Sequence, residues 1–382
     1  MIRFKRKKPW RIIRWTVLLT LPIAAAGTAK LIPTMRSAAE KMCMSDSVKE
    51  TSADAPKQSK TDNLLRSDTL SGEAMLSHGY GVYAEISSSE VRLQSPLDME
   101  SDDPGEKPYP ENWSKGIKVV RTTYGEYNGT TYFDLDKCGQ VNNKSDISND
   151  TLLKESRLLP DFTISETDEP QVLIYHTHTT ESFEPFVRDN MDAEFNYRTT
   201  DETKNMIMVG NAIQAELEAK GIGVIHVTEI HDYPSYNGSY GRSRESIVPI
   251  LEQYPEIKVA LDIHRDAIAG EDFAAQPYTE IDGREAAQIM IISGCDDGTL
   301  NMPNYLKNFH FASSLQQQLE GDYPGLTRPI LFDYRHYNQD LTTGSLLIEV
   351  GSHGNTLEQV QYSGQLIGRS LCRLLEELRA CS

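Results

Sequence analysis

The sequence has few cysteines and none of them form a close pair. Its five cysteines, Cys43, Cys138, Cys295, Cys372 and Cys381, are far apart, and no Cys-x-x-Cys spacing occurs. Zinc sites built on cysteine usually contain such pairs, so cysteine is not the expected ligand of a metal here. The sequence also lacks a Gly-x-Ser-x-Gly nucleophile elbow and a phosphate-binding P-loop. Neither an elbow-type serine hydrolase nor a P-loop nucleotide hydrolase is therefore indicated.

Basic residues are scarce outside the N-terminus. The first fourteen residues hold seven bases and no acid. Removing these seven from the 38 lysines and arginines leaves 31 bases against 56 acids, a net charge of −25 for the rest of the chain. Nucleic-acid binding depends largely on basic contacts to phosphate. Nucleic acid is therefore not an expected partner.

A long uninterrupted apolar run is missing as well. The run from Trp15 to Ala29 extends to Ile32 only by including Lys30, whereas a helix that spans a bilayer needs about 20 apolar residues. The small residues at 24–27 would suit cleavage of a signal peptide. We expect residues 1–33 to form a retained membrane anchor, with the basic end in the cytoplasm and the acidic body outside the cell membrane.

Three further regions follow the N-terminal segment. Residues 34–115 are rich in Ser, Asp, Glu, Lys and Pro, which predicts a flexible tether. Residues 116–168 predict a small β segment, with a hairpin around Tyr127-Asn128-Gly129. Residues 169–382 form the expected catalytic domain.

The last region alternates between strand and helix patterns. Met206, Val209, Ile213 and Leu217 recur at helical spacing. A closing helix is expected to begin after Thr356 with a capping box. Such alternation predicts an α/β fold, in which a mostly parallel sheet is covered by helices on both faces.

Three of the strand-like segments end in ionisable side chains. The first ends in His176, His178 and Glu181, the second in His264 and Asp266, and the third in Glu349 and His353. In an open α/β sheet, ligands bind beyond the carboxyl ends of the strands, so these groups are expected to meet there.

The residue types at these ends favour a zinc hydrolase. Catalytic zinc takes three protein ligands and keeps a fourth position open, and His178, Glu181 and His264 provide such a set. His176 is an alternative ligand or a residue that orients one. Glu349 ends an otherwise apolar strand, where burying a carboxylate costs free energy unless the group has a partner or a function. General acid/base catalysis is such a function.

Several alternatives remain open from the residues alone. A lone histidine at a strand end is most often a hydrogen-bonded structural residue, and Glu349 could pair with Arg265. Arg265 and Asp266 could bind a substrate carboxylate or orient His264, and pairing at the surface is equally compatible with the sequence.

Together these motifs resemble the stage II sporulation protein P family of endospore-forming bacteria. The resemblance runs from about Val119 to the C-terminus and is carried by VLIYHTHTTESF, NMIMVGNAI, HDYPSYNGSYGRSRESI, LDIHRDA and IEVGSHGNT. It implies a zinc-dependent N-acetylmuramoyl-L-alanine amidase with the α/β fold of zinc amidases and one Zn²⁺ per catalytic domain. By the same resemblance, the ligands come from the His176/His178/Glu181 block and His264, and Glu349 is the catalytic glutamate.

The resemblance also implies a setting. The protein would be a single-pass membrane protein at the sporulation septum and would thin septal peptidoglycan during engulfment. Its substrate would be the junction of muramic acid and stem peptide, and its partners other membrane-bound engulfment proteins, including a lytic transglycosylase. The alternatives are a zinc endopeptidase or carboxypeptidase that acts on stem peptides and a non-catalytic envelope binding protein.

Overall fold

The computed structural model describes residues 116–167, 169–191, 197–270 and 272–379. The predicted anchor (1–33) and tether (34–115) lie outside these ranges. Within them, no helix combines the length and the apolar character needed to cross a membrane.

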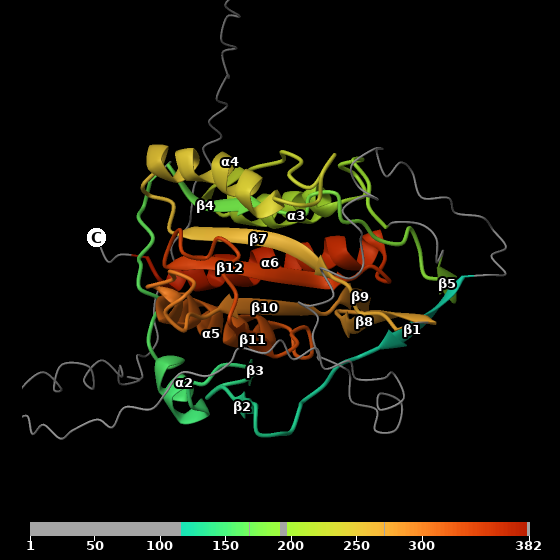
Figure 1. Ribbon diagram of the computed structural model, residues 1–382, viewed down its shortest axis with the longest axis horizontal. Helices are drawn as coiled ribbons and strands as arrows, with labels where there is room; N and C mark the ends of the chain where they lie inside the picture. Colours follow the sequence, from blue (N-terminus) through green and yellow to red (C-terminus); the bar gives the residue numbers. More distant parts are fainter. Residues whose placement is uncertain (1–115, 168, 192–196, 271, 380–382) are drawn as a thin grey trace, which may run out of the picture. The chain divides into compact units, whose positions relative to one another are not determined.

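An eight-stranded sheet forms the centre of the described domain (Figure 1). In spatial order its strands are β2 (Tyr132–Asp134), β3 (Gln140–Asn143), β11 (Ile330–Asp333), β10 (Ile289–Gly294), β12 (Gly344–Ser352), β7 (Val259–Asp266), β4 (Pro170–Tyr175) and β6 (Gly223–His226). The β2–β3 and β10–β12 pairs are antiparallel, and the other neighbours are parallel. The sheet is therefore mixed, and the expectation of a mostly parallel sheet was wrong.

The reversal at β10 has a local cause. Between β7 and β10 the chain forms a hairpin of β8 (Phe273–Ile281) and β9 (Arg284–Ala287). Its turn residues Asp282 and Gly283 have φ of 52° and 73°, which is the backbone that an Asp-Gly hairpin turn adopts. Because the chain turns back in this hairpin, β10 runs opposite to β12.

A second, four-stranded sheet corrects another expectation. It has the order β5 (Asn190–Met191), β1 (Ile117–Thr122), β8 and β9. The hairpin predicted around Tyr127-Asn128-Gly129 was wrong, because β1 pairs with β8 whereas β2 pairs with β3. The apolar side of β1 is buried against β5 and β8, where Val119, Met191 and Ala274 form a small core.

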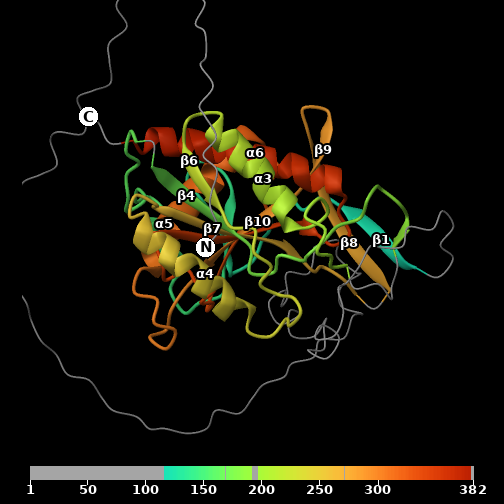
Figure 2. The ribbon, with the colours of Figure 1, turned by 90° about the horizontal axis from the view of Figure 1, so that it is seen from above.

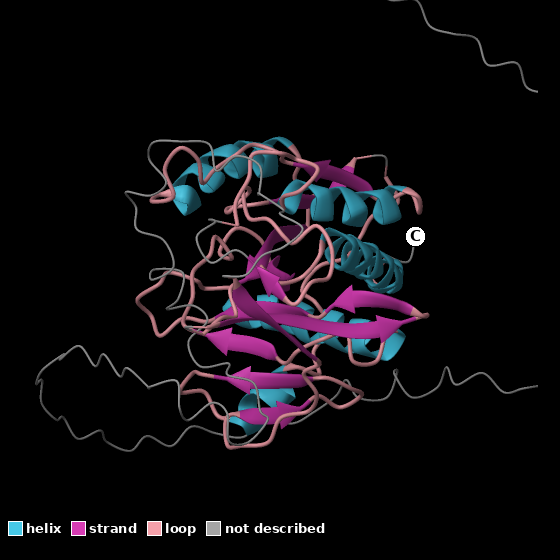
Figure 3. Cartoon of the chain, turned by 90° about the vertical axis from the view of Figure 1, so that its right-hand side faces the viewer, coloured by secondary structure: helices cyan, strands magenta, loops and turns pink. Residues whose placement is uncertain are grey.

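Helices cover both faces of the large sheet (Figures 2 and 3). The helices α3 (Met206–Glu218), α5 (Tyr305–Asp322) and α6 (Leu357–Glu377) pack on the face that carries the main core. On the other face, α4 (Ser239–Gln253) buries Ile247 against Leu173 and Tyr175 of β4. A short helix, α2 (Asn149–Glu155), follows β3.

The predicted capping box and the helix at 206–217 are both present. Thr356 accepts a hydrogen bond from the Gln359 backbone, and the Gln359 side chain accepts one from the Thr356 backbone. Two glycines of α6 allow α3 to approach closely. A Cβ at Gly364 would lie 3.0 Å from a backbone oxygen of α3, and one at Gly368 would lie 2.9 Å from another. Close packing of α6 on α3 thus fixes one wall of the core.

Candidate metal centre and active site

Three neighbouring parallel strands bring the predicted residues to one region. β4, β7 and β12 lie side by side, and His264 of β7 is the register partner of Glu349 of β12. Because side chains alternate along a strand, Asp262 and His264 point to the same face. The loop 176–181 leaves the end of β4 beside them.

His178 is the central side chain of this cluster. It is 2% exposed, and its ring stacks on Tyr236 with centroids 4.5 Å apart. The edge of His264 lies against it, with centroids 5.2 Å apart. Neither ring nitrogen of His178 has a hydrogen-bond partner in the described part of the chain. Burial, followed by the positive charges nearby, holds the pKa of His178 well below its usual range, so its ring is neutral.

Glu181 lies between the guanidinium of Arg198, the backbone of Arg265 and the ring of His264. Its Oε2 accepts a hydrogen bond from the backbone N–H of Arg265 (3.0 Å) and lies 3.8 Å from Nδ1 of His264. Its Oε1 lies 3.5 Å from Nη2 of Arg198. Two ligands bound at about 2.0–2.2 Å to a tetrahedral zinc ion lie roughly 3.3–3.6 Å apart. The Glu181–His264 separation of 3.8 Å is only slightly longer, so a small movement would bring both atoms to ligand distance of a single ion.

His264 is surrounded by carboxylates. Its Nε2 lies 2.9 Å from Oδ1 of Asp262. Burial opposes a charged ring, but the carboxylates of Asp262, Glu181 and Glu349 raise the pKa of His264 to about 10. The surroundings of this ring thus favour a positive charge, which either a proton or a bound cation would provide.

The side chains of this cluster are of the types that bind zinc. The described residues contain no group of three or more His, Cys, Asp and Glu side chains already arranged to hold a metal ion. The donor types are nevertheless those of a zinc site, and the orphaned, neutral ring of His178 lies beside His264 and Glu181. Donor chemistry and the orphaned nitrogens fit zinc, and the ion itself stays a prediction.

Glu349 is buried on β12, where the strand becomes irregular. It is 3% exposed, and the register with β7 shifts between Glu349 and Ser352. Gly351 in this irregular stretch has a φ of 67°, and a Cβ there would lie 2.6 Å from Asn355 Oδ1. A glycine is therefore required within β12, two residues after Glu349.

His176 lies apart from this cluster. Its Nδ1 is 2.9 Å from the carbonyl oxygen of Ile263, and its Nε2 is 2.8 Å from Nε2 of His226 on β6. Gly210 of α3 lies against both rings, so His176 faces the α3 side of the sheet. The structure brings His178, Glu181 and His264 together and leaves His176 among structural contacts.

Arg265 and Asp266 contact the protein itself. The guanidinium of Arg265 donates to the carbonyl oxygens of Ser182 (3.1 Å) and Tyr197 (3.2 Å). Asp266 accepts a bond of 2.7 Å from the fully buried Arg328. Substrate binding by these two residues stays a prediction.

Sequence reasoning missed several residues around the cluster. They are Asp262, Asp232, Arg198, Tyr236 and Tyr240. Alternation along the strand could have indicated Asp262, which is two residues before His264. The others come from loops and from α4, so only the three-dimensional fold places them here.

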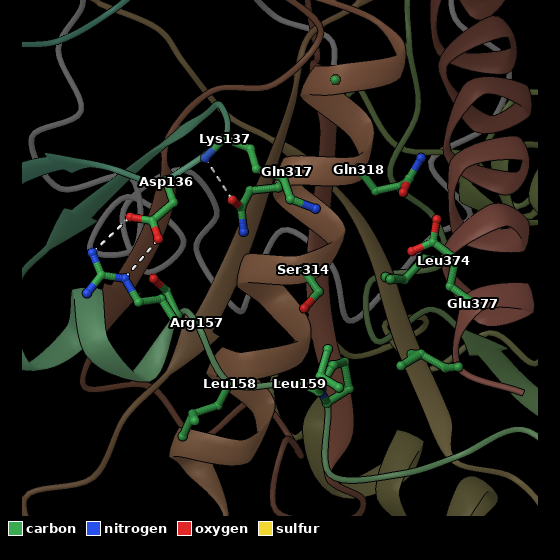
Figure 4. Close-up of a pocket in the computed structure, with 14 residues that line it drawn as sticks. Asp136, Lys137, Arg157, Leu158, Leu159, Ser314, Gln317, Gln318, Leu374 and Glu377 are labelled. Carbon is green, nitrogen blue, oxygen red and sulfur yellow. Dashed lines mark hydrogen bonds and ion pairs between the residues drawn. The ribbon is translucent and has the colours of Figure 1, made fainter. Parts of the chain in front are cut away.

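A cavity of about 520 Å³ lies elsewhere (Figure 4). Leu158 and Leu159 line it together with side chains of α5 and of the end of α6. Because α5 and α6 cover the opposite face of the sheet, this cavity is separate from the His178 cluster, and no residue of the cluster lines it.

Two solved amidase structures show low similarity to this chain. The match to the N-acetylmuramoyl-L-alanine amidase AmiC2 of Nostoc punctiforme covers 54% of this chain and 96% of the AmiC2 chain, with 11% identity and a TM-score of 0.32. The match to the CwlD amidase of Clostridioides difficile, solved in complex with the GerS lipoprotein, covers 54% of this chain and 99% of the matched chain, with 12% identity and a TM-score of 0.36.

Sequence comparison gives the family. The model for stage II sporulation protein P matches residues 130–371. The stage II sporulation protein P of Bacillus subtilis (strain 168) is 31% identical over 205 residues, which are 51% of this chain and 48% of that protein. The chain thus spans about half the length of this curated relative. With the family match covering all three strand ends, the chain belongs to the stage II sporulation protein P family.

Proposed function

We propose that this chain is a zinc-dependent N-acetylmuramoyl-L-alanine amidase that thins septal peptidoglycan during sporulation. Family membership supports the substrate class. The observation that carries the chemistry is the buried ring of His178, whose nitrogens have no partner in the described residues and which lies beside His264 and Glu181.

His178, Glu181 and His264 would hold the ion. When bound, zinc would supply a Lewis acid for the amide carbonyl and lower the pKa of a water molecule. Neutral histidine is the form that ligates a metal. The depressed pKa of His178 keeps this ring neutral, whereas His264, whose pKa is raised to about 10, would have to release its proton when the ion binds.

Glu349 is the proposed general base and acid. Its carboxylate would take a proton from the attacking water as the oxygen bonds to the lactyl carbonyl carbon. The same carboxyl group would then give that proton to the alanine nitrogen as the C–N bond breaks. A buried carboxylate next to His264 suits this role, because proton transfer needs a fixed donor and acceptor.

Membership of the family supports the proposed setting as well. The N-terminal segment would anchor the chain in the cell membrane with its catalytic domain outside, at the sporulation septum. Membrane-bound engulfment proteins, including a lytic transglycosylase, would be its partners. Cleavage within the stem peptide is the competing activity, because a His-x-x-Glu pair with a distant histidine also serves zinc peptidases.

Digestion of purified sacculi by the full chain, followed by mass spectrometry, tests the proposal. We expect complete stem peptides with a free L-alanine amine and no product in the presence of chelator. Glu349→Gln should lower the rate by about 10²–10⁴-fold, because general acid/base catalysis contributes that much, and His264→Ala should abolish it. Asp136→Asn is the control, because Asp136 pairs with Arg157 at an exposed position that has no contact with the cluster.

Three other outcomes of the digestion would contradict the proposal. Shortened stem peptides would show a peptidase. Unchanged rates in Glu349→Gln and His264→Ala would refute the assigned residues. A wild-type chain that yields no product would indicate a non-catalytic envelope protein.

A further inference from the structure

Two fully buried aspartates hold the loop 176–181 in the same way. Asp262 accepts the backbone N–H of Thr177 (2.8 Å) and the Thr177 hydroxyl (2.6 Å). Asp232 accepts the backbone N–H of Thr180 (3.0 Å) and the Thr180 hydroxyl (2.7 Å). These two Asp–Thr clamps flank His178 in the chain, so they fix the loop from both sides.

Each aspartate is also linked to a predicted zinc ligand. Asp262 Oδ1 lies 2.9 Å from Nε2 of His264. Asp232 accepts a bond of 2.6 Å from Arg198, and the other terminal nitrogen of Arg198 lies 3.5 Å from Oε1 of Glu181. One clamp therefore reaches His264 directly, and the other reaches Glu181 through Arg198.

These contacts distinguish the atoms of the two predicted ligands. Asp262 lies beside Nε2 of His264, which leaves Nδ1 on the side of Glu181, 3.8 Å from its Oε2. Arg198 lies beside Oε1 of Glu181, which leaves Oε2 on the side of His264. The two inward-facing atoms are thus Nδ1 of His264 and Oε2 of Glu181.

We propose that Asp262 and Asp232 are positioning residues, which select Nδ1 of His264 and Oε2 of Glu181 as the atoms that face the zinc ion. This inference rests on the proposed zinc site and adds how that site is built. Asp262 lies within ion-pair distance of Nε2 of His264, although the two atoms do not have hydrogen-bond geometry in the described residues. A carboxylate this close to the distal nitrogen of a ligating histidine favours a proton on that nitrogen and leaves the other nitrogen for the metal. Both aspartates are 0% exposed, and burying a carboxylate costs free energy. Neutral side chains could hold the loop equally well, so the two buried charges favour a role at the zinc site.

The Asp262 clamp continues into α4. The Thr177 hydroxyl lies 2.9 Å from the Ser243 hydroxyl, and Asn338 donates to Ser243 (3.1 Å). Substitutions should therefore be isosteric, so that the buried network keeps its shape.

Zinc affinity of the full chain, measured by competition with a chelating dye, tests the proposal. Asp262→Asn and Asp232→Asn should each weaken zinc binding by about 10- to 100-fold, the usual effect of losing such a partner. Thr177→Val and Thr180→Val should also weaken it. Thr177→Ser and Thr180→Ser keep the hydroxyl and should retain wild-type affinity, as should Asp136→Asn, which changes an exposed ion pair with Arg157.

Nitrogen NMR of the zinc-loaded chain provides a readout that folding alone would not change. We expect Nε2 of His264 to carry the proton and Nδ1 to be coordinated. Wild-type zinc affinity in both aspartate variants, or coordination through Nε2, would overturn the proposal. If the wild-type chain binds zinc but leaves sacculi intact, the proposed function is wrong. The zinc affinities of the aspartate and threonine variants would still test the positioning role. A wild-type chain that binds no zinc overturns both.

Discussion

His178 is a residue that the fold keeps at a cost in stability. Its ring is buried, neutral and without a hydrogen-bond partner in the described residues. A buried polar group without a partner costs about 1–3 kcal/mol. Such a cost is common at functional sites, where activity and stability conflict.

Replacing this ring by a benzene ring should therefore stabilise the metal-free protein. His178→Phe keeps the stack on Tyr236 and removes both orphaned nitrogens. We expect the free energy of unfolding in chelator to rise by about 1 kcal/mol and added zinc to give no further stabilisation. Denaturant unfolding with and without zinc measures both. A variant that is less stable than the wild type in chelator would contradict the orphaned state of the ring.

The histidine pair on the other side of the sheet should make stability depend on pH. Burial lowers the pKa of His226 from 6.5 to about 4. The unfolded chain therefore takes up a proton at a higher pH than the folded chain, so stability is complete above about pH 6.5 and is lost as the pH falls toward 4.

Replacing His226 should remove part of this dependence. In His226→Gln, the loss of unfolding free energy between pH 7 and 5 should be smaller than in the wild type by about 1–2 kcal/mol. Denaturant unfolding at several pH values measures this. An identical pH dependence in His226→Gln and wild type would refute the interpretation.

At the scale of elements, α3 is shaped by the histidine pair that it covers. A Cβ at Gly210 would lie 2.4 Å from Nε2 of His226 and 2.8 Å from Nε2 of His176. In α4, by contrast, a Cβ at Gly241 would meet nothing within 4 Å. The two helices thus contain one glycine that packing requires and one that it does not.

The same substitution should therefore have opposite effects in the two helices. Gly210→Ala should destabilise the protein by about 1–3 kcal/mol, because overpacking outweighs the gain in helix propensity. Gly241→Ala should stabilise it by up to about 1 kcal/mol. Thermal unfolding of both variants measures the effects, and stabilisation by Gly210→Ala would show that the two rings can move aside.

Local patterns predicted most of these elements, and contacts far apart in the chain determined the rest. The capping box at Thr356 and the spacing of apolar residues in α3 are short-range signals, and both helices are present. The partner of β1 is β8, more than 150 residues away. No local turn signal could indicate that pairing. The reversal of β10 follows from the Asp282-Gly283 turn, which is a local signal in the sequence.

At the scale of the whole molecule, the candidate site is a product of the strand order. The sequence indicated that β4, β7 and β12 end in ionisable groups, and their adjacency in the sheet brings these groups together. The position of His176 could have been inferred, because Val172, Ile174 and His176 alternate and the first two belong to the main core. Arg198 and Asp232 could not, since long loops place them.

Zinc stoichiometry of the purified full chain tests the central claim most directly. After equilibration with zinc and removal of free metal, the wild type should retain one ion per chain. His178→Phe and His264→Ala should each retain none. If the wild type retains no more zinc than these variants, the gathering of His178, Glu181 and His264 is not a metal site, and the account is contradicted.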